Sequence, residues 1–563
     1  MTGDIARFEG DWGSLVAAAT PYGGYQPIET DTDILVMLGG PLLTFDQPKE
    51  PTDAAERKTR AILHRLQAGK MNWTEDLNGP FLVLHVNKRD RTVTSVTDLM
   101  MFIPFYHHLV GDDLMIGSHV DALARAAEQT QQIDFISVSD FLRHQVITHP
   151  FTLYEAVRQG DASSIHSFIP DPSRGCRLQQ ETYWRPTEEP PPDSFAETAH
   201  RLRDALQRYI EGVTGEAQTI AQFLSAGEDS RVIASLLRAH PRHDGLIFLD
   251  RMNREGQLAE QIASIYQVNM KPMFRDADHY YRMLGSASSL VGSGLPYVHA
   301  HCVGLDQAAN LSRYDAVFGG FLADTLLKSK PRPKRKARRK EHLPALPRYL
   351  LPGYREATWT YAHPWLAHDQ LLVAEERRRA HWQRIVEWRP TSAHQWFYLY
   401  PSSMRSTLGY FHSNRRLFRS YEPFMCHEVV RISASVPESW KAGRRLFHRA
   451  FRDDLRSAAT VIHPKGHYPH RPHWANLIMR PVTRLQRSLR KSVGTDQGNQ
   501  GPWGDWAHIR QQCPWEQDLQ RRANDHSLIE NPGGEHLREA IRTGKLTMQE
   551  SLRLHQLLVC SKI

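Results

Sequence analysis

The 563-residue sequence has few cysteines and no long apolar run. Its five cysteines lie far apart, without the CxxC spacing of zinc or redox motifs, which argues against a disulfide framework and favours a reducing compartment. No apolar stretch reaches the length that crosses a membrane, and the first residues carry no signal-peptide pattern. A globular, cytoplasmic protein without a membrane span is therefore expected.

Acidic residues are outnumbered by basic ones, and the formal net charge of +8 is concentrated in one segment. Residues 328–340 read KSKPRPKRKARRK, a proline-broken cationic run that a folded core would not bury. Such a run can bind nucleic acid, acidic lipid or an acidic polymer, or it can be a solvated loop. No aromatic residues alternate with its charges, as they do where bases stack, so a flexible basic insert is favoured over a nucleic-acid partner.

Two domains are predicted, separated by the proline-rich joint Glu-Glu-Pro-Pro-Pro-Asp at residues 188–193. Residues 1–187 are rich in strand patterns, whereas strands alternate with helices over residues 193–563. The alternation predicts an α/β domain with a parallel sheet, helices on both faces and ligands at the carboxyl ends of the strands. The expected strands are Asp33–Leu38, the hairpin Phe81–Val86 and Arg91–Val96, Thr219–Leu224, Gly245–Leu249 and Ala316–Phe318.

One strand–loop–helix unit has the form of an anion site. The strand Thr219–Leu224 ends in Ser225-Ala226-Gly227-Glu228-Asp229-Ser230, and helix-forming residues resume at Val232. Such a unit directs backbone N–H groups and the positive end of a helix at one point, which suits a phosphate or pyrophosphate. Asp229 adds a carboxylate where a Mg²⁺ bound to that anion would lie. No Gly-Lys-Ser/Thr follows, so the loop is not a Walker A motif, and an ordinary capped loop is the alternative. Two further loops, residues 249–255 and 319–324, are expected at the same edge of the sheet.

The order of several motifs resembles the asparagine synthetase family. The Ser225–Ser230 loop resembles its Ser-Gly-Gly-x-Asp-Ser pyrophosphate loop, with Ala226 in place of the first glycine. The other matching segments are Leu77–Phe81, Thr97–Tyr106, Ile116–Ser118, Tyr183-Trp184-Arg185-Pro186, Glu255 with Ala259 and Ala263, Gly319-Gly320 with Asp324, and His463-Pro464-Lys465-Gly466.

The resemblance implies a fold and a reaction. The fold would be a glutaminase-like αββα (Ntn-type) domain over residues 1–187, followed by a Rossmann-like (HUP) ATP-pyrophosphatase domain over residues 193–563 with the basic insert 328–340. The reaction would be ATP-dependent adenylation of a substrate carboxylate, followed by attack of ammonia or an amine to form an amide. ATP and Mg²⁺ are the implied cofactors. A homodimer is compatible with the resemblance.

The resemblance also assigns site residues. Lys465 would stabilise charge on the tetrahedral intermediate and its AMP leaving group. Asp229 and Asp324 would hold Mg²⁺. The residues implied to bind ATP are Leu224, Ser225, Ala226, Gly227, Asp229, Ser230, Leu249, Gly319 and Gly320. Arg231, where the family more often has serine, could contact phosphate or lie on the helix surface.

Three departures qualify the implied reaction. Thr2 stands where glutamine-hydrolysing members have a cysteine; it could be a nucleophile, but a scaffold without amidase activity is favoured. Glutamine is then not the expected nitrogen source unless a separate amidase hydrolyses it. Phe321 cannot transfer a proton, so the base would be another group, such as Glu255 or a histidine. His463, His467, His470 and His473 cluster without a nearby carboxylate in sequence, which favours a loop closing over ATP rather than a metal site.

The acceptor is left open by the sequence. Relatives without the cysteine include β-lactam synthetases, lasso-peptide cyclases and enzymes that amidate sugar acids, so a small molecule, a precursor peptide or a polysaccharide could be the partner. A non-catalytic nucleotide-binding pseudoenzyme is the alternative from another class. A tRNA-modifying ATP pyrophosphatase is a third interpretation, which the glutaminase-like first domain disfavours.

Overall fold

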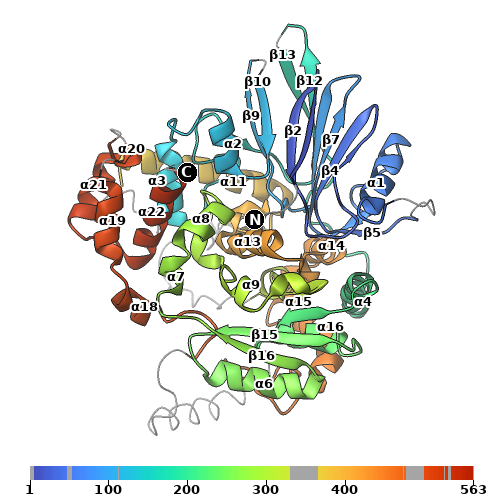
Figure 1. The fold of residues 1–563 in the computed structure, drawn as a ribbon. Coiled ribbons are helices and arrows are strands. Elements are labelled where there is room, and N and C mark those ends of the chain that lie inside the picture. Colours follow the sequence, from blue (N-terminus) through green and yellow to red (C-terminus); the bar gives the residue numbers. More distant parts are fainter. Residues whose placement is uncertain are drawn as a thin grey trace, which may run out of the picture.

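The computed structural model describes residues 5–46, 53–111, 113–173, 175–329, 366–472, 475–476, 500–524, 526–530 and 534–561. Thr2, His473 and residues 330–340 of the basic run lie outside these ranges. The described chain forms an antiparallel sheet region, a parallel sheet and a group of C-terminal helices (Figure 1). None of its helices is long and apolar enough to cross a membrane.

The N-terminal region consists of antiparallel sheets. Its elements are β1 (Ile5–Gly10), β2 (Gly13–Ala18), β3 (Ile28–Glu29), β4 (Asp33–Gly39), β5 (Leu42–Leu43), α1 (Arg57–Gln67), β6 (Leu77–Asn78), β7 (Phe81–Asn87), β8 (Thr92–Thr97), β9 (Tyr106–Val110), β10 (Asp113–Gly117), α2 (Val120–Ala126), α3 (Phe135–His144), β11 (Arg158–Gln159), β12 (Ser164–Asp171) and β13 (Gly175–Thr182). Six strands pair in the order β13-β12-β8-β7-β4-β3, and β10-β9-β11 form a second sheet. The expected β7–β8 hairpin and the expected strand β4 are both present.

Side chains alternate along β4 as the period of a strand requires. Leu35 and Met37 pack with Ile62 of α1, while Ile34 and Val36 pack in a separate cluster with residues of β2. All four β4 side chains are buried, because α1 covers one face of this strand and β2 the other.

The joint between the two predicted domains is held to the helical part of the second. Arg389, which follows α11 (His368–Trp388), donates hydrogen bonds to the carbonyls of Pro186 and Thr187, at 2.7 and 3.0 Å. The N–H of Glu188 bonds to the carbonyl of Trp388. α4 (Phe195–Thr214) then begins with a capping box formed by Ser194 and Glu197.

The five-stranded sheet that follows α4 is parallel throughout, as the sequence predicts. Its strands are β14 (Ile220–Phe223), β15 (His243–Leu249), β16 (Asn269–Phe274), β17 (Ala316–Phe318) and β18 (Ser420–Tyr421). They pair in the order β16-β15-β14-β17-β18, with β14 in the centre. The helices of this region are α5 (Glu228–Leu236), α6 (Arg254–Tyr266), α7 (His279–Arg282), α8 (Leu284–Val291), α9 (Leu305–Ala308), α10 (Ala323–Leu326), α12 (Ala393–Trp396), α13 (Gly409–Leu417), α14 (His427–Ser435), α15 (Glu438–Lys441) and α16 (Arg445–Arg456).

Both faces of the parallel sheet are covered. Leu224 after β14 packs with Ala234 of α5 and Ile262 of α6 in one cluster. Ala221 of β14 packs with Leu305 of α9 in another cluster. Figure 1 shows α6 beneath β15 and β16. The carboxyl ends of the strands remain as the edge at which a ligand could bind.

The C-terminal helices pack back onto the N-terminal region. These helices are α18 (Trp506–Gln512), α19 (Trp515–Ala523), α20 (Ser527–Glu530), α21 (Glu535–Arg542) and α22 (Met548–Cys560). Leu554 and Leu558 of α22 share a core with Phe141 of α3 and Leu123 of α2. The red helices lie beside α2 and α3 in Figure 1.

Candidate active site

The Ser225–Ser230 loop is braced by its own side chains. The Ser230 hydroxyl donates to the carbonyl of Ser225 (2.9 Å) and lies 3.2 Å from its N–H group. The N–H of Gly227 bonds to the Ser225 hydroxyl, and the N–H of Ala226 to the Glu255 carboxylate at 2.8 Å. The N–H groups of Ser225, Ala226 and Gly227 are therefore occupied within the protein.

The first turn of α5 offers free donors instead. Its N-cap is Gly227, whose side chain can accept no hydrogen bond from the helix. The N–H groups of Glu228, Asp229 and Ser230 have no intrahelical acceptor, because they open the helix. They lie at the positive end of the helix, where an anion is favoured.

The three expected loops contact one another. Glu255, at the start of α6, reaches the Ser225–Ser230 loop through its bond to Ala226. Gly320 approaches so closely that a Cβ added there would lie 3.1 Å from Cβ of Asp229. At Gly319 an added Cβ would lie 2.2 Å from a carboxylate oxygen of Glu422, so only glycine fits.

Glu255 is occupied as a structural acceptor. Its side chain is buried under the loop, and burial raises the pKa of its carboxyl. A carboxylate that holds the Ala226 N–H group positions the loop.

Lys328 joins the two predicted metal ligands. Its Nζ contacts the carboxylate of Asp229 and lies 3.0 Å from that of Asp324 in the first turn of α10. Burial raises the pKa of Asp229 to about 6, against the opposing effect of the ammonium. Although burial also disfavours the ionised form of Asp324, Lys328 holds its pKa below the usual value. The first residue of the basic run is thus a buried site residue, which differs from the solvated loop expected for this run.

The donor set of Asp229 and Asp324 fits a divalent cation. Two carboxylates that already share one positive group, at a helix N-terminus suited to phosphate, are ligands of the type that Mg²⁺ prefers. The Lys328 ammonium lies between them and would compete for the same oxygens.

Arg231 lies neither on the helix surface nor in the cavity described below. It is fully buried and donates to the carbonyls of Val461 (2.7 Å), Ala226 (3.1 Å) and Ile462 (3.1 Å). Arg231 therefore fastens the Ser225–Ser230 loop to the segment that leads into Lys465, and this replaces both roles expected for it.

Lys465 is exposed beside this edge of the sheet. Its N–H group bonds to Nδ1 of His463, while its ammonium influences the pKa of both Asp229 and Asp324 without contacting either. An exposed ammonium near the two carboxylates, on a segment tied to the loop by Arg231, is free to meet a substrate.

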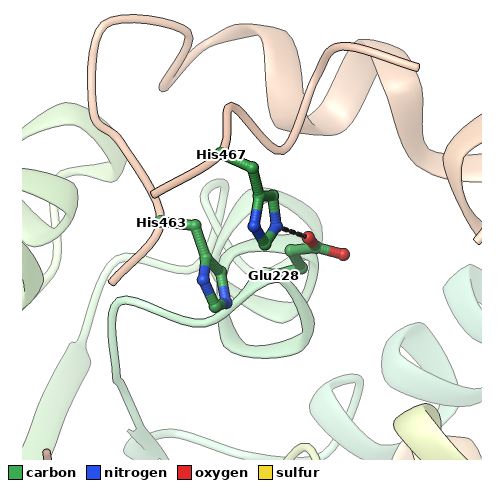
Figure 2. Close-up of side chains that lie close together, drawn as sticks. All are labelled: Glu228, His463 and His467. Atoms are coloured by element: carbon green, nitrogen blue, oxygen red, sulfur yellow. Dashed lines mark hydrogen bonds and ion pairs between the residues drawn. The ribbon is translucent and has the colours of Figure 1, made fainter. Parts of the chain in front are cut away.

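A carboxylate does accompany the histidine cluster, contrary to the sequence-based expectation. Glu228 of α5 lies against His467 (2.6 Å), and the His463 and His467 rings stack at 4.2 Å (Figure 2). Together the three residues could hold a metal ion by geometry. Arg444, however, contacts Glu228 and lies 3.1 Å from Nε2 of His467. Since these groups are already paired with a guanidinium, the cluster acts as a brace for the His463–His467 segment.

Burial makes Glu422 neutral near pH 7. This residue follows β18, accepts the N–H of Phe321 at 2.8 Å and is 1% exposed. Desolvation raises the pKa of its carboxyl to about 8. The Phe321 ring lies 5.4 Å from that of Tyr410, so apolar and aromatic groups surround the position expected to lack a base.

Glu422→Gln is expected to flatten the pH dependence of stability. Between the usual glutamate pKa of 4.5 and the folded value of about 8, the folded protein binds one proton more than the unfolded chain. The free energy of unfolding therefore falls as pH rises through this window, by at most about 1.4 kcal/mol per pH unit. Urea unfolding at pH 6, 7 and 8 gives the free energy of unfolding at each pH. This free energy should fall less steeply with pH for the variant than for wild type. Glu376→Gln, at an exposed position, serves as control. The same pH dependence of the free energy of unfolding in all three proteins would contradict the raised pKa of Glu422.

A cavity of about 740 Å³ opens above this edge of the sheet. Of the predicted site residues, those that line it are Leu224, Ser225, Gly227, Asp229, Ser230, Gly320 and Asp324. Those that do not are Ala226, Leu249, Gly319 and Lys465. Leu249 is buried beside Ile247 and Ala259, while Leu246, Ile247 and Phe248 of the same strand reach the cavity.

Several lining residues were missed by sequence reasoning. Lys328, which pairs with the two carboxylates but does not line the cavity, had one local signal, because it follows Asp324 by four residues, the spacing of ion pairs on a helix. Arg405 and the α22 residues that line the cavity, among them Arg553, had none, since they arrive from distant parts of the chain.

Comparison with known families identifies one domain. Residues 19–184 match the family model of the glutamine amidotransferase domain. The match covers β3 to β13, so the N-terminal region is of the amidotransferase type, as the resemblance implied. The chain matches no curated protein.

Proposed function

We propose that the chain is an ATP-dependent carbon–nitrogen ligase, which adenylates a substrate carboxylate and transfers the acyl group to ammonia or an amine. The observation that carries the proposal is the meeting of the α5 N-terminus, Asp229 and Asp324 at the carboxyl edge of a parallel sheet, above a cavity large enough for a nucleotide and a substrate. The amidotransferase-type first domain supports nitrogen transfer as the reaction class.

The proposed reaction has two steps, adenylation and amide formation. A substrate carboxylate oxygen forms a bond to the α-phosphorus of ATP while the bond to pyrophosphate breaks. An amine nitrogen then forms a bond to the acyl carbon, the bond to AMP breaks, and the amine proton passes to a base. The free N–H groups of α5 would bind the departing pyrophosphate. Asp229 and Asp324 would hold Mg²⁺, which neutralises phosphate charge. Lys465 would stabilise charge on the tetrahedral intermediate and on AMP.

The nitrogen source is ammonia or an amine in this proposal. Thr2, the residue at the position of the family nucleophile, lies outside the described residues, and cis hydrolysis of glutamine is not part of the proposal. A separate amidase, or an amine on the acceptor itself, would then supply the nitrogen. Small molecules, precursor peptides and polysaccharides remain the acceptor classes to be tested.

A nucleotide-binding pseudoenzyme is the second candidate. It is favoured by one observation, namely that the Lys328 ammonium lies between the two carboxylates expected to hold metal. A protein in which Lys328 stays paired with both carboxylates, so that no metal ion binds them, would bind ATP without turning it over.

Pyrophosphate exchange with ATP, Mg²⁺ and a panel of carboxylates tests the proposal. Exchange with one carboxylate would establish adenylation, and Asp229→Asn should abolish it while the fold is kept. Full exchange by this variant would remove Asp229 from the site. ATP binding by calorimetry without exchange across the panel would favour the pseudoenzyme or an acceptor absent from the panel, and a peptide panel separates these two.

Lys465→Ala is expected to keep ATP binding and to lower the rate of amide formation roughly tenfold to a hundredfold. Its ammonium is exposed in the free protein, so solvent screens it there and its effect on ATP affinity should be small. It would act on charge that develops in the transition state. Single-turnover kinetics and calorimetry check this, with Lys545→Ala, at an exposed position in the loop between α21 and α22, as control. An unchanged rate would place Lys465 outside the reaction.

A further inference from the structure

The cavity also has an aromatic wall that the adenylation chemistry does not use. Trp506 packs against Tyr280 at 4.7 Å, and Trp503, which is 56% exposed, packs against His301 at 4.5 Å. Tyr280 and His301 are themselves linked by a 3.0 Å hydrogen bond. Burial holds the pKa of His301 well below its usual value, so its imidazole is neutral, while the Arg275 guanidinium over the Tyr280 ring is paired with Asp250 at 3.1 Å. An aromatic wall whose cation is already paired favours an apolar or aromatic ligand body.

Helix α22 brings one cation into this part of the cavity. Met548, Leu552, Arg553 and Gln556 line it at the spacing of one helix face. The face is fixed because the Gln556 side chain accepts the N–H of Tyr297 (2.9 Å) and donates to backbone carbonyls of two neighbouring residues.

Arg553 is buried, and within the described residues it forms no ion pair. It is 7% exposed, its Nε has no hydrogen-bond partner, and Glu550 acts on it only as a nearby charge. The nearest acid on its own helix, Glu550, is used in the capping box with Thr547. Burial lowers the pKa of Arg553 to about 10, which leaves it charged at neutral pH. A buried unpaired cation is costly unless an anion completes it.

We propose that Arg553 and the wall formed by Tyr280, Trp503 and Trp506 are the pocket of the acyl substrate, and that this substrate is an aromatic or bulky apolar acid with a second carboxylate. The second carboxylate pairs with Arg553, whose planar fork suits it. The apolar body lies on the wall. The first carboxylate points toward α5 and Asp229, and this last step rests on the proposed function. Aspartate is too small and too polar to fill such a pocket.

Three probes test the pocket without any turnover. Benzylsuccinate carries an aromatic ring and two carboxylates, 3-phenylpropionate lacks the second carboxylate, and succinate lacks the ring. Calorimetry and tryptophan fluorescence should show binding of benzylsuccinate to wild type, weaker binding of 3-phenylpropionate and none of succinate. Arg553→Gln should weaken benzylsuccinate at least about tenfold and leave 3-phenylpropionate unchanged. Arg553→Lys should restore part of the affinity, and the exposed Arg542→Gln on α21 is the matched control.

Other outcomes would overturn either the substrate pocket or the ligase proposal, and they can be told apart. If wild type binds none of the probes, or if Arg553→Gln weakens both aromatic probes equally, the arginine has only a structural role. If AMP displaces benzylsuccinate, the aromatic wall belongs to the nucleotide. Pyrophosphate exchange with aspartate alone would overturn the inference and leave the ligase proposal standing. Arg553-dependent binding of benzylsuccinate without any ATP binding would support the pocket and overturn the ligase proposal.

Discussion

Lys328→Met is expected to create a site for a divalent cation in the nucleotide-free protein. In wild type the Lys328 ammonium contacts Asp229 and lies 3.0 Å from Asp324, so a metal ion must displace a positive group that already pairs with both carboxylates. Two unit charges 4 Å apart interact by about 4 kcal/mol at an effective dielectric constant of 20. Removing the competing charge should therefore raise Mn²⁺ affinity by at least about a hundredfold, since each 1.4 kcal/mol is a factor of ten.

Electron paramagnetic resonance of free Mn²⁺ measures this directly. Wild type should leave the free-ion signal nearly unchanged, and the Met variant should reduce it in proportion to protein. Lys328→Arg, which keeps the charge, should behave like wild type, and adding Asp229→Asn to the Met variant should abolish the new site. Lys271→Met, which removes a lysine paired with Asp244 at 2.6 Å elsewhere on the sheet, is the matched control. Equal Mn²⁺ binding by wild type and the Met variant would show that Lys328 does not compete for this site.

This experiment also separates the two candidate functions. If wild type with ATP removes more free Mn²⁺ than ATP alone does, and Asp229→Asn with ATP does not, the nucleotide has displaced Lys328 from the carboxylates, as a ligase requires. If only the Met variant ever binds the ion, the lysine acts as a permanent substitute for metal, and the pseudoenzyme becomes the better account. The same residue would then explain why a chain with both carboxylates is inactive.

Local patterns in the sequence predicted the frame of this site. The strand ending at Phe223, the small-residue loop and a following helix were predictable because strand period, glycine and helix onset are properties of neighbouring residues. The helix begins at Glu228, however, four residues before the expected Val232, so Asp229 and Ser230 lie in its first turn. The parallel arrangement followed from the alternation of strands and helices, and the strand order places the loop at the sheet centre. Because the three loops follow parallel strands that end at the same edge of the sheet, contact between the loops could be expected.

The electrostatics of the site could not be predicted in the same way. Lys328 was assigned to a solvated run because charge density is visible in sequence, whereas burial at the first residue of the run depends on the fold. Glu228 meets His467 from 239 positions away, so no local pattern could join them. Arg553 reaches the cavity because the C-terminal helices pack back onto α2 and α3, a long-range arrangement that helical periodicity does not determine.

Arg231 is the clearest case of a burial that sequence reasoning missed, and its replacement should have a large effect. Arg231→Met keeps much of the side-chain volume but leaves the carbonyls of Ala226, Val461 and Ile462 without their donor. An unsatisfied buried acceptor costs about 1–3 kcal/mol, so with partial relaxation a loss of about 3 kcal/mol in the free energy of unfolding is expected. The loop and the Lys465 segment would also lose their common anchor, so activity should fall even where the protein is folded.

Urea unfolding and pyrophosphate exchange should therefore both change in Arg231→Met, whereas Arg452→Met at an exposed position of α16 should change neither. The decisive comparison is with Arg231→Lys, which keeps the positive charge but cannot span three carbonyls with one ammonium. If charge alone mattered, as it would for a phosphate contact, the lysine variant would retain exchange. If Arg231 acts as an anchor between two segments, the lysine variant should lose stability and exchange together. Normal stability in both variants would contradict the anchoring role of Arg231.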